Sequence, residues 1–584
     1  MEKFFRYEKY SYFKSYAWVL FYISNVTFNL KAARSVLIVL RSKLFCAMLI
    51  PVAFFFLYLA YYGFRDEGLD DFFMAATLSG AYGLKYRVYM LFVNVLYGYM
   101  LLPLYALFPS VNWYNVGEAL LSLCAMGTVV YVLLWKAGRR AGFLLGVLFC
   151  AVFCKDMFLE FNFTHFAGIL AAAGGLWTAE CIAENWNWKR WLWGGFLLLM
   201  ASLIRYEAFL MSLPFFGATV AYCFVFKTGR GHLLRNALGL ALIALCVVGA
   251  KKFDSYMYAR DAGLSYYRSY SDIRASIVDY NDFDYGGIYD AMEDAGFKSV
   301  DARMLNRWTF YDTEVFSLDN LKKMQKIIRD NYPPESYRLK NAFLYERFSN
   351  AFRLPMFWFC LLLGFLAYRS DRRSILALWA GFAIAAAMYT YFVYIGRLPL
   401  RLEYCIWVSC ACLVIFASRE WSAFTAFLTR KKAAVALLGL CCLLPLYLDS
   451  SRKKIPVPAY INLQNYMKNR PGELFLIEFE KYKTMGAVIA SGGIFKSVPK
   501  NGLSNQIPLG YWNVGFPGIT DILKSRGINN PMRAVADDRV YVVGQMNKEY
   551  LREHYPECLS AIPERIYSKD SSFVFRYSKD RGGE

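Results

Sequence analysis

The sequence predicts a polytopic α-helical membrane protein with a small α/β domain after its last span, on three observations. Hydrophobic residues make up 57% of the 584 residues. Apolar runs of about 15 to 22 residues recur, and roughly 20 are needed to cross a hydrocarbon core about 30 Å thick. The sequence after residue 450 alternates strand-like runs with helical ones, which is typical of an α/β domain. The strand-like runs are 474–479, 540–544 and 573–577, and a helical one is 547–554.

The first apolar run, Leu44–Phe64, follows a basic segment at 1–43. No small-residue cleavage site stands at its end, so we expect a retained span and not a signal peptide. The further candidate spans are apolar runs separated by polar or basic turns. They are 88–108, 116–135, 141–154, 163–183, 191–204, 208–226, 236–250, 352–368, 374–395, 404–418 and 433–449.

Basic residues set the expected orientation in the membrane. The net charge is +21, and the bases gather in short loops, which the positive-inside rule places in the cytoplasm. This distribution argues against nucleic acid as a partner and favours anionic lipid or a lipid-linked phosphate. The loops concerned are 136–140, 189–190, 227–235, 369–373 and 430–432.

The segment 88–108 conflicts with this orientation if it crosses the membrane. It contains Asn94, Gly98 and Pro103 among four tyrosines, a composition that suits an interfacial or re-entrant hairpin. We therefore expect residues 65–115 to form one long first loop outside the cytoplasm. An N-terminus outside the cytoplasm is the alternative.

About eleven spans then remain. We expect a cytoplasmic segment at 1–43, a seven-span module at 44–250, an external loop domain at 251–350 and four further spans at 351–449. The external α/β domain follows at 450–584. Cysteines are concentrated in the membrane half, where they resemble small core residues. With only three histidines, a His/Cys metal site is not expected.

Four carboxylates stand within six residues just beyond the first span, namely Asp66, Glu67, Asp70 and Asp71. A carboxylate at the membrane–water boundary can take a proton from an acceptor hydroxyl, and a like-charged neighbour raises its pKa toward that task. The alternative is structural: Asp70 would cap a helix that starts at Asp71, and both acids would favour its N-terminus.

Arg205 and Glu207 lie between two short apolar runs. Ionisable residues between such spans are costly unless they face a cavity, so Arg205 is a candidate for binding a phosphate that Glu207 helps to orient. A structural Arg–Glu pair at the turn is the alternative.

Arg397 and Arg401 lie in another external turn and depart from the positive-inside pattern. An anionic group in the interface would explain them, and snorkelling of long basic side chains is the alternative.

Asp156 and Glu160, with His165, lie on the same expected side as the first loop and are candidates for a second acid or for acceptor contacts. A lone histidine at a helix start is more often a satisfied interfacial residue.

No nucleotide-binding loop or hydrolase elbow occurs in a convincing context, so a substrate must arrive already activated. At this location the natural one is a polyprenyl-phosphate sugar. The chain resembles the GT-C class of integral membrane glycosyltransferases, including the protein mannosyltransferase and lipid A aminoarabinose transferase groups, and the O-antigen glucosyltransferase-type proteins. The likeness lies in the first-loop acids followed by Ser79-Gly80, a span ending in basic residues at 134–140, the acids Asp156 and Glu160, and the short spans meeting at 205–207.

The resemblance implies an inverting transfer to a cell-envelope glycan, polymer, lipid or protein at the outer face of the cell membrane. Asp70 is the first choice as base, followed by Asp71, with Asp66 and Glu67 in reserve. Arg205, Arg397 and Arg401 would stabilise the leaving lipid phosphate. Some members use a divalent cation, which makes Mg²⁺ or Mn²⁺ a candidate, although no metal constellation is visible. The alternatives are a transporter or flippase of a lipid-linked precursor, which usually shows repeated halves and ionisable residues near the bilayer midplane, and a non-catalytic scaffold.

Overall fold

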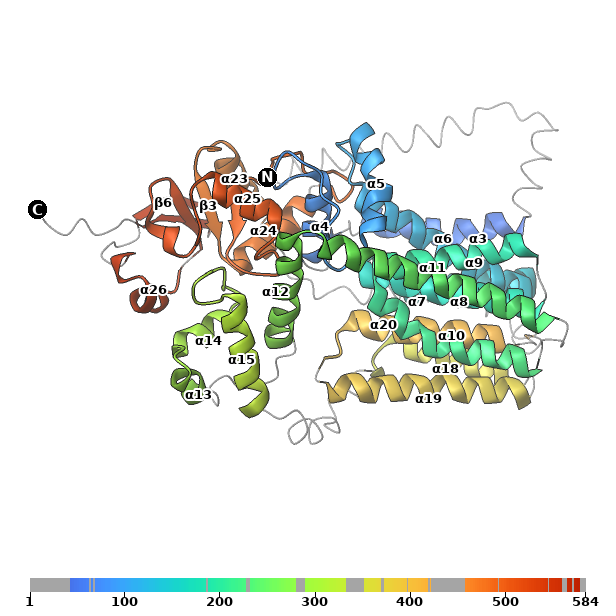
Figure 1. Ribbon diagram of the computed structural model, residues 1–584. Helices are drawn as coiled ribbons and strands as arrows, with labels where there is room; N and C mark the ends of the chain where they lie inside the picture. Colours follow the sequence, from blue (N-terminus) through green and yellow to red (C-terminus); the bar gives the residue numbers. More distant parts are fainter. Residues whose placement is uncertain are drawn as a thin grey trace, which may run out of the picture.

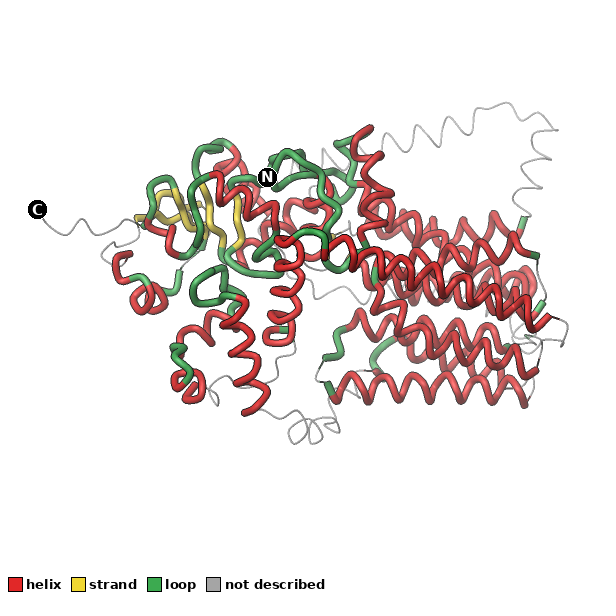
Figure 2. Tube along the Cα trace, viewed as in Figure 1, coloured by secondary structure: helices red, strands yellow, loops and turns green. Residues whose placement is uncertain are grey.

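The computed structural model places a bundle of long helices at one end of the molecule and a mixed region of helices, loops and strands at the other (Figures 1 and 2). It describes the chain from residue 42 to residue 577 with internal gaps. The described ranges are 42–61, 65–66, 69–184, 187–226, 232–279, 289–331, 351–368, 372–395, 397–418, 421, 457–491, 493–544, 546–558, 564–569 and 572–577.

Eight helices in the described ranges are long and apolar enough to cross a membrane, as expected for a multi-pass membrane protein. Two further helices of the bundle, α9 and α18, are shorter. The predicted span 433–449 lies outside the described residues. The bundle consists of α3 (Lys43–Tyr61), α6 (Trp113–Lys136), α7 (Gly138–Leu159), α8 (Phe163–Ala183), α9 (Trp188–Ile204), α10 (Tyr206–Phe226), α11 (Leu233–Ala259), α18 (Pro355–Tyr368), α19 (Arg372–Tyr394) and α20 (Leu400–Ala417).

Helix α11 runs nine residues beyond the end predicted for its span, from residue 250 to Ala259. Its buried Asp254 explains the extension. One carboxylate oxygen accepts the backbone N–H of Val95 at 3.0 Å, and the other pairs with Arg268 at 2.9 Å. The last turns of α11 are polar and extend beyond the apolar bundle. They stay helical because their side chains bind residues of other segments.

Helix α5 (Val95–Leu107) has 13 residues and so spans only about 20 Å. The chain before it bonds to the C-terminal part of the protein, since Asn501 donates its backbone N–H to the Gly80 and Gly83 carbonyls. The chain after it does the same, since Ser497 donates to the carbonyl of Ser110. Ser497 and Asn501 are four residues apart, and four residues span at most about 14 Å. The chain before α5 and the chain after it therefore lie close together, at the face of the bundle that carries the C-terminal domain. This geometry favours the prediction that 88–108 does not cross the membrane.

Pro109, which is exposed just after α5, offers a test of that prediction. We expect Pro109→Cys in intact cells to react with an impermeant maleimide before any permeabilisation, because the residue lies on the same side as the C-terminal domain. Arg139→Cys, at an exposed site in the first turn of α7, is the matched control and should label only after permeabilisation. Protection of Pro109→Cys in intact cells would show that the segment crosses.

The region between α11 and α18 forms a helical lobe of α12 (Ala262–Val278), α13 (Tyr289–Asp294), α14 (Ser299–Asn306) and α15 (Leu318–Asn331). Buried Asp312 fixes this lobe to the C-terminal domain. Its carboxylate accepts the hydroxyls of Tyr550 and Tyr555 at 2.7 and 2.6 Å, and the Asn530 side chain at 2.9 Å.

The C-terminal domain, residues 457–577, contains a five-stranded sheet in the order β4-β3-β5-β7-β6. β3 pairs in parallel with β4 and β5, while β7 is antiparallel to β5 and β6. The three strand-like runs of the sequence correspond to β3, β5 and β7, and β4 and β6 were not foreseen. The elements are α23 (Val457–Lys468), β3 (Leu474–Ile477), α24 (Phe479–Ser491), β4 (Gln506–Pro508), α25 (Pro517–Ser525), β5 (Val540–Val543), α26 (Lys548–His554), β6 (Glu564–Lys569) and β7 (Ser572–Arg576).

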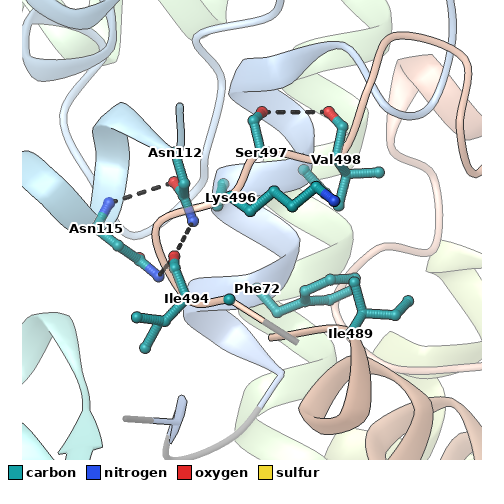
Figure 3. Close-up of a pocket in the computed structure, with 11 residues that line it drawn as sticks. Phe72, Asn112, Asn115, Ile489, Ile494, Lys496, Ser497 and Val498 are labelled. Atoms are coloured by element: carbon teal, nitrogen blue, oxygen red, sulfur yellow. Dashed lines mark hydrogen bonds between the residues drawn. The ribbon is translucent and has the colours of Figure 1, made fainter. Parts of the chain in front are cut away.

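A loop of the C-terminal domain forms hydrogen bonds with the start of α6 (Figure 3). The side-chain amides of Asn112 and Asn115 both donate to the carbonyl of Ile494 at 3.0 Å, and the backbone N–H of Asn112 donates to Phe495. The adjoining cavity measures only about 20 Å³, which is room for about one water. These hydrogen bonds attach the C-terminal domain to the bundle, and the cavity beside them is too small for a sugar.

Candidate active site

A two-stranded parallel sheet brings the first loop next to the second acidic segment, which contains Asp156 and Glu160. β1 (Arg65–Asp66) pairs with β2 (Glu160–Phe161), with Arg65 opposite Glu160 and Asp66 opposite Phe161. β2 follows the last residue of α7 and precedes α8. The pairing therefore fixes Asp66 at the end of the bundle where α8 begins, which we call the domain end. Glu67 lies outside the described residues.

Asp70 opens helix α4 (Asp70–Ser79) and faces the C-terminal domain. Its Oδ1 accepts hydrogen bonds from the Tyr511 hydroxyl and from the Trp512 indole N–H, the latter at 2.8 Å. The expectation that Asp70 caps a helix starting at Asp71 is wrong. The helix begins one residue earlier, its N-cap residue is Leu69, and no side chain caps it. Asp70 instead joins the first loop to the C-terminal domain.

Asp71 is fully buried and faces the bundle. Its Oδ1 accepts the Tyr114 hydroxyl at 3.0 Å and the backbone N–H of Phe163 at 3.1 Å. Phe163 is the first residue of α8, so this carboxylate satisfies a backbone donor at the positive end of that helix. The two adjacent aspartates thus bind partners in different parts of the protein. Asp71 binds the membrane module, and Asp70 binds the C-terminal domain.

Three mutually packed helices begin at the domain end. Near their starts, the Cys405 thiol of α20 donates to the Thr164 carbonyl of α8 at 3.5 Å. At the far end of the same helices, the rings of Tyr222 in α10 and Phe416 in α20 lie 5.9 Å apart. α8, α10 and α20 are therefore parallel, and the partial positive charges of three helix N-termini converge on one region.

Arg205 lies at this convergence, immediately before α10. Its guanidinium carbon is 4.9 Å from the ring centre of Phe92 and 5.0 Å from that of Phe163. It also pairs with Glu207 at 2.9 Å, and Glu207 is largely exposed. The Arg–Glu pair that the sequence suggested at this turn is therefore present. Phe163 links the two groups directly, because its backbone binds Asp71 and its ring supports Arg205.

The other two predicted arginines differ from each other. Arg401 is in the first turn of α20, one turn before Cys405 and hence beside the start of α8. Arg397 lies 3.5 Å from Asp279, which also pairs with the buried Arg274 of the helical lobe at 2.8 Å. Arg401 thus stays a candidate for binding phosphate, whereas the position of Arg397 indicates that it anchors the lobe to the bundle.

The second acidic segment supplies side chains of mixed exposure. Asp156 is partly buried at the end of α7, 4.0 Å from Lys155, and Glu160 is partly exposed on β2. His165 is 2% exposed and packs its ring 4.8 Å from that of Tyr404. Asp156 and Glu160 therefore stay candidates for second acids, while His165 occupies a core position.

Sequence reasoning missed the aromatic residues that cover the first-loop acids. Tyr511 and Trp308 both adopt positive φ, 78° and 56°, an uncommon conformation for aromatic residues that persists only where the surroundings enforce it. The ring of Trp308 stacks on Phe479 at 5.3 Å, and Arg274 lies 5.3 Å above it. A signal was present in the run Gly510-Tyr511-Trp512, but its partner Trp308 is about two hundred residues away.

Gly510 is the point of closest approach in this cover. A methyl group there would lie 1.7 Å from the backbone oxygen of Trp308, so we expect Gly510→Ala to displace Tyr511 from Asp70. The free energy of unfolding should fall by about 1–3 kcal/mol. The measurement is a lower melting temperature of the solubilised protein. Gly472→Ala, where nothing lies within 4 Å of the added carbon, should leave it unchanged. Equal melting temperatures of the two variants would contradict the packing.

No group of three His, Cys, Asp or Glu side chains in the described ranges is arranged to hold a metal ion. Glu160 and Asp156 supply oxygen atoms of the kind that Mg²⁺ or Mn²⁺ prefers, and Asp66 is in the neighbouring strand.

No protein-family model and no curated protein match the chain. The structure is similar to that of the oligosaccharyltransferase of Archaeoglobus fulgidus in complex with Zn and sulfate, at 12% identity and a TM-score of 0.43, over 92% of this chain and 73% of that one. It is also similar to AglB from the same organism in complex with an inhibitory peptide and a dolichol-phosphate, at 13% identity and 0.43, over 86% and 68%. These are GT-C glycosyltransferases, the class that the sequence resembles. At this similarity they identify neither the substrate nor the site of this chain.

Proposed function

We propose that this protein is a membrane glycosyltransferase that moves a sugar from a polyprenyl-phosphate donor to an acceptor of the cell envelope. The observation that supports it is the domain end of the bundle, where acidic and basic groups meet. Three helix N-termini and the guanidinium groups of Arg205 and Arg401 provide a region of positive charge. The first-loop acids lie against the same residues, through Phe163 and β2.

The positive region fits the lipid phosphate. A phosphate at the membrane surface carries the charge that helix N-termini and arginine bind, and it becomes the leaving group in sugar transfer. These groups would stabilise the negative charge that grows on the leaving phosphate oxygen as its bond to the sugar carbon breaks. Arg205 is oriented for this role by two aromatic rings and by Glu207.

The acid that activates the acceptor is a separate question, for which we propose Asp66 because the two neighbouring aspartates already bind protein donors. Asp71 is fully buried among protein donors, and Asp70 is bound by Tyr511 and Trp512. Both serve as positioning residues in this arrangement. Asp66 is on the strand beside Glu160, at the end of α7. The acceptor hydroxyl would give its proton to the base while its oxygen attacks the sugar carbon from the side opposite the phosphate, which inverts the configuration.

The test is sugar transfer by the full-length protein in proteoliposomes. Short-chain polyprenyl-phosphate sugars, each radiolabelled, are offered with envelope glycan and lipid fractions, and empty liposomes are the control. We expect one donor to yield labelled product of inverted configuration and free polyprenyl phosphate in equal amounts. If no donor is consumed while a fluorescent lipid-linked precursor crosses the bilayer faster than in empty liposomes, the protein is a transporter and the proposal is wrong.

A further inference from the structure

A cleft of about 520 Å³ lies away from the first-loop acids, among segments far apart in the sequence. We call it the tyrosine cleft, after Tyr266, Tyr270 and Tyr311 in its lining. Its walls come from α12, the 311–316 loop of the helical lobe, the start of α25 and Arg87 of the first loop. Its volume is typical of a binding site for a small molecule or a few sugar units.

The aromatic part of the lining presents rings with fixed positions. Tyr266 and Tyr270 are one turn apart on α12, with ring centres 5.9 Å apart, and Tyr266 is 41% exposed. Tyr311 is nearly buried beside Thr520 and Gly515, and burial raises its pKa to about 12, so its hydroxyl stays neutral. The hydroxyl of Tyr270 is buried without a hydrogen-bond partner among the described residues. Tyr270 itself is only 1% exposed, so Tyr266 is the ring of the three that a ligand in the cleft can reach.

The polar part of the lining has mixed charge. Arg87 pairs with Asp521 at 2.6 Å across the rim, Lys524 adds a second cation, and the remaining acids already have structural partners. Asp261 accepts the backbone N–H of Leu264 at the start of α12, and Asp312 binds Tyr550 and Tyr555. A lining of nearly balanced charge does not favour a polyphosphate or a nucleic acid, which select clusters of basic residues.

Two features also disfavour a peptide ligand. No residue of the five strands lines the tyrosine cleft, so an extended peptide finds no strand edge to pair with. The lining also alternates aromatic faces with hydroxyl, amide and charged groups. Such surfaces suit a ligand that has apolar C–H faces and many hydroxyls, as a sugar ring does.

We propose that the tyrosine cleft binds the glycan chain of the acceptor, a neutral or zwitterionic oligosaccharide, at a distance from the transfer site. This inference rests on the proposed function and adds a substrate class to it. Arg87 belongs to the first loop, which also carries Asp70 and Asp71, so an acceptor held in the cleft contacts the same loop as the transfer site.

The experiment compares two tyrosine variants of the full-length protein in detergent. Tyr266→Ala removes the exposed ring of the cleft, and Tyr256→Ala removes a tyrosine that is 59% exposed on α11 outside it. Each protein is titrated with a panel of neutral and zwitterionic envelope oligosaccharides, followed by saturation-transfer NMR, with acidic and neutral peptides as competitors. We expect Tyr266→Ala to weaken binding of at least one oligosaccharide about tenfold, with no change for Tyr256→Ala.

Transfer kinetics separate this inference from the proposed function. With a working donor, Tyr266→Ala should raise the KM for an extended acceptor and leave kcat and the donor KM unchanged. Transfer by the wild type with no oligosaccharide binding, or with equal acceptor KM in both variants, overturns the cleft assignment alone. Displacement of the oligosaccharide by a peptide at lower concentration also overturns it, in favour of a peptide acceptor. Oligosaccharide binding that is sensitive to Tyr266→Ala, without any transfer, supports the cleft and contradicts the proposed enzyme.

Discussion

Asp66→Asn should lower kcat for sugar transfer by about 10²–10⁴-fold, the usual contribution of a general base. The substitution keeps the size of the side chain and removes its ability to accept a proton. β1 is held to β2 by its backbone, so the fold should survive. The KM for the donor should stay within about twofold, because the donor phosphate contacts other residues. Steady-state transfer at varied donor concentration in proteoliposomes measures both constants.

The other first-loop acids define what would contradict this assignment. Asp70→Asn should weaken the contact with Tyr511 and Trp512 and reduce kcat by a smaller factor, whereas Asp71→Asn should mainly lower the melting temperature, since Asp71 is buried at the start of α8. Asp319→Asn, a change at an exposed acid of the helical lobe, is the matched control and should be neutral. Full activity of Asp66→Asn with loss of activity in Asp70→Asn would make Asp70 the base.

Arg205→Ala should lower kcat by about 10²–10³-fold, as is found when one group that stabilises a developing negative charge is removed. The guanidinium packs against Phe92 and Phe163 within 5.0 Å, and this packing holds it in place at the starts of α8 and α10. Arg205→Lys should recover only part of the activity, because an ammonium lacks the planar surface that stacks on both rings.

Arg260→Ala provides a control of the same chemistry. Arg260 also lies over an aromatic ring, that of Tyr256 at 5.6 Å, but at the end of α11 and away from the first-loop acids. Its loss should leave transfer unchanged. If Arg205→Ala transfers sugar at the wild-type rate, the phosphate is held elsewhere, and Arg401 becomes the first residue to examine. Full activity of Arg205→Lys would contradict only the role of ring stacking.

Much of the helical fold follows from sequence pattern, because spans are long and local. Apart from 88–108, where only Val95–Leu107 is helical, each predicted span that the structure describes overlaps a helix, with bounds that differ by up to several residues. The exceptions arise from tertiary contacts. α11 extends to Ala259 because Asp254 finds Val95 and Arg268, and a local hydropathy pattern contains no sign of partners so far away in the chain.

In the candidate site, too, local pattern predicts some features and tertiary contacts determine the others. Composition and location singled out the first-loop acids and Arg205, and the structure places them on two sides of Phe163. The sequence pattern could not show that Asp70 binds the C-terminal domain while Asp71 binds the bundle. Adjacent residues of one helix differ only in which face they occupy. Nor could the sequence pattern assign Arg397 to Asp279, because that pair joins two separate domains of the chain.

The most direct measurement is the labelling of Glu207→Cys in intact cells with an impermeant maleimide, with and without short-chain polyprenyl phosphate. Glu207 is largely exposed beside Arg205, and unsubstituted protein gives the background. We expect labelling before permeabilisation, at the same face as Pro109→Cys, and slower labelling when the lipid phosphate is added. Labelling only from the cytoplasm, or a rate that the lipid phosphate does not change, would contradict a phosphate site on the outer face beside the first-loop acids.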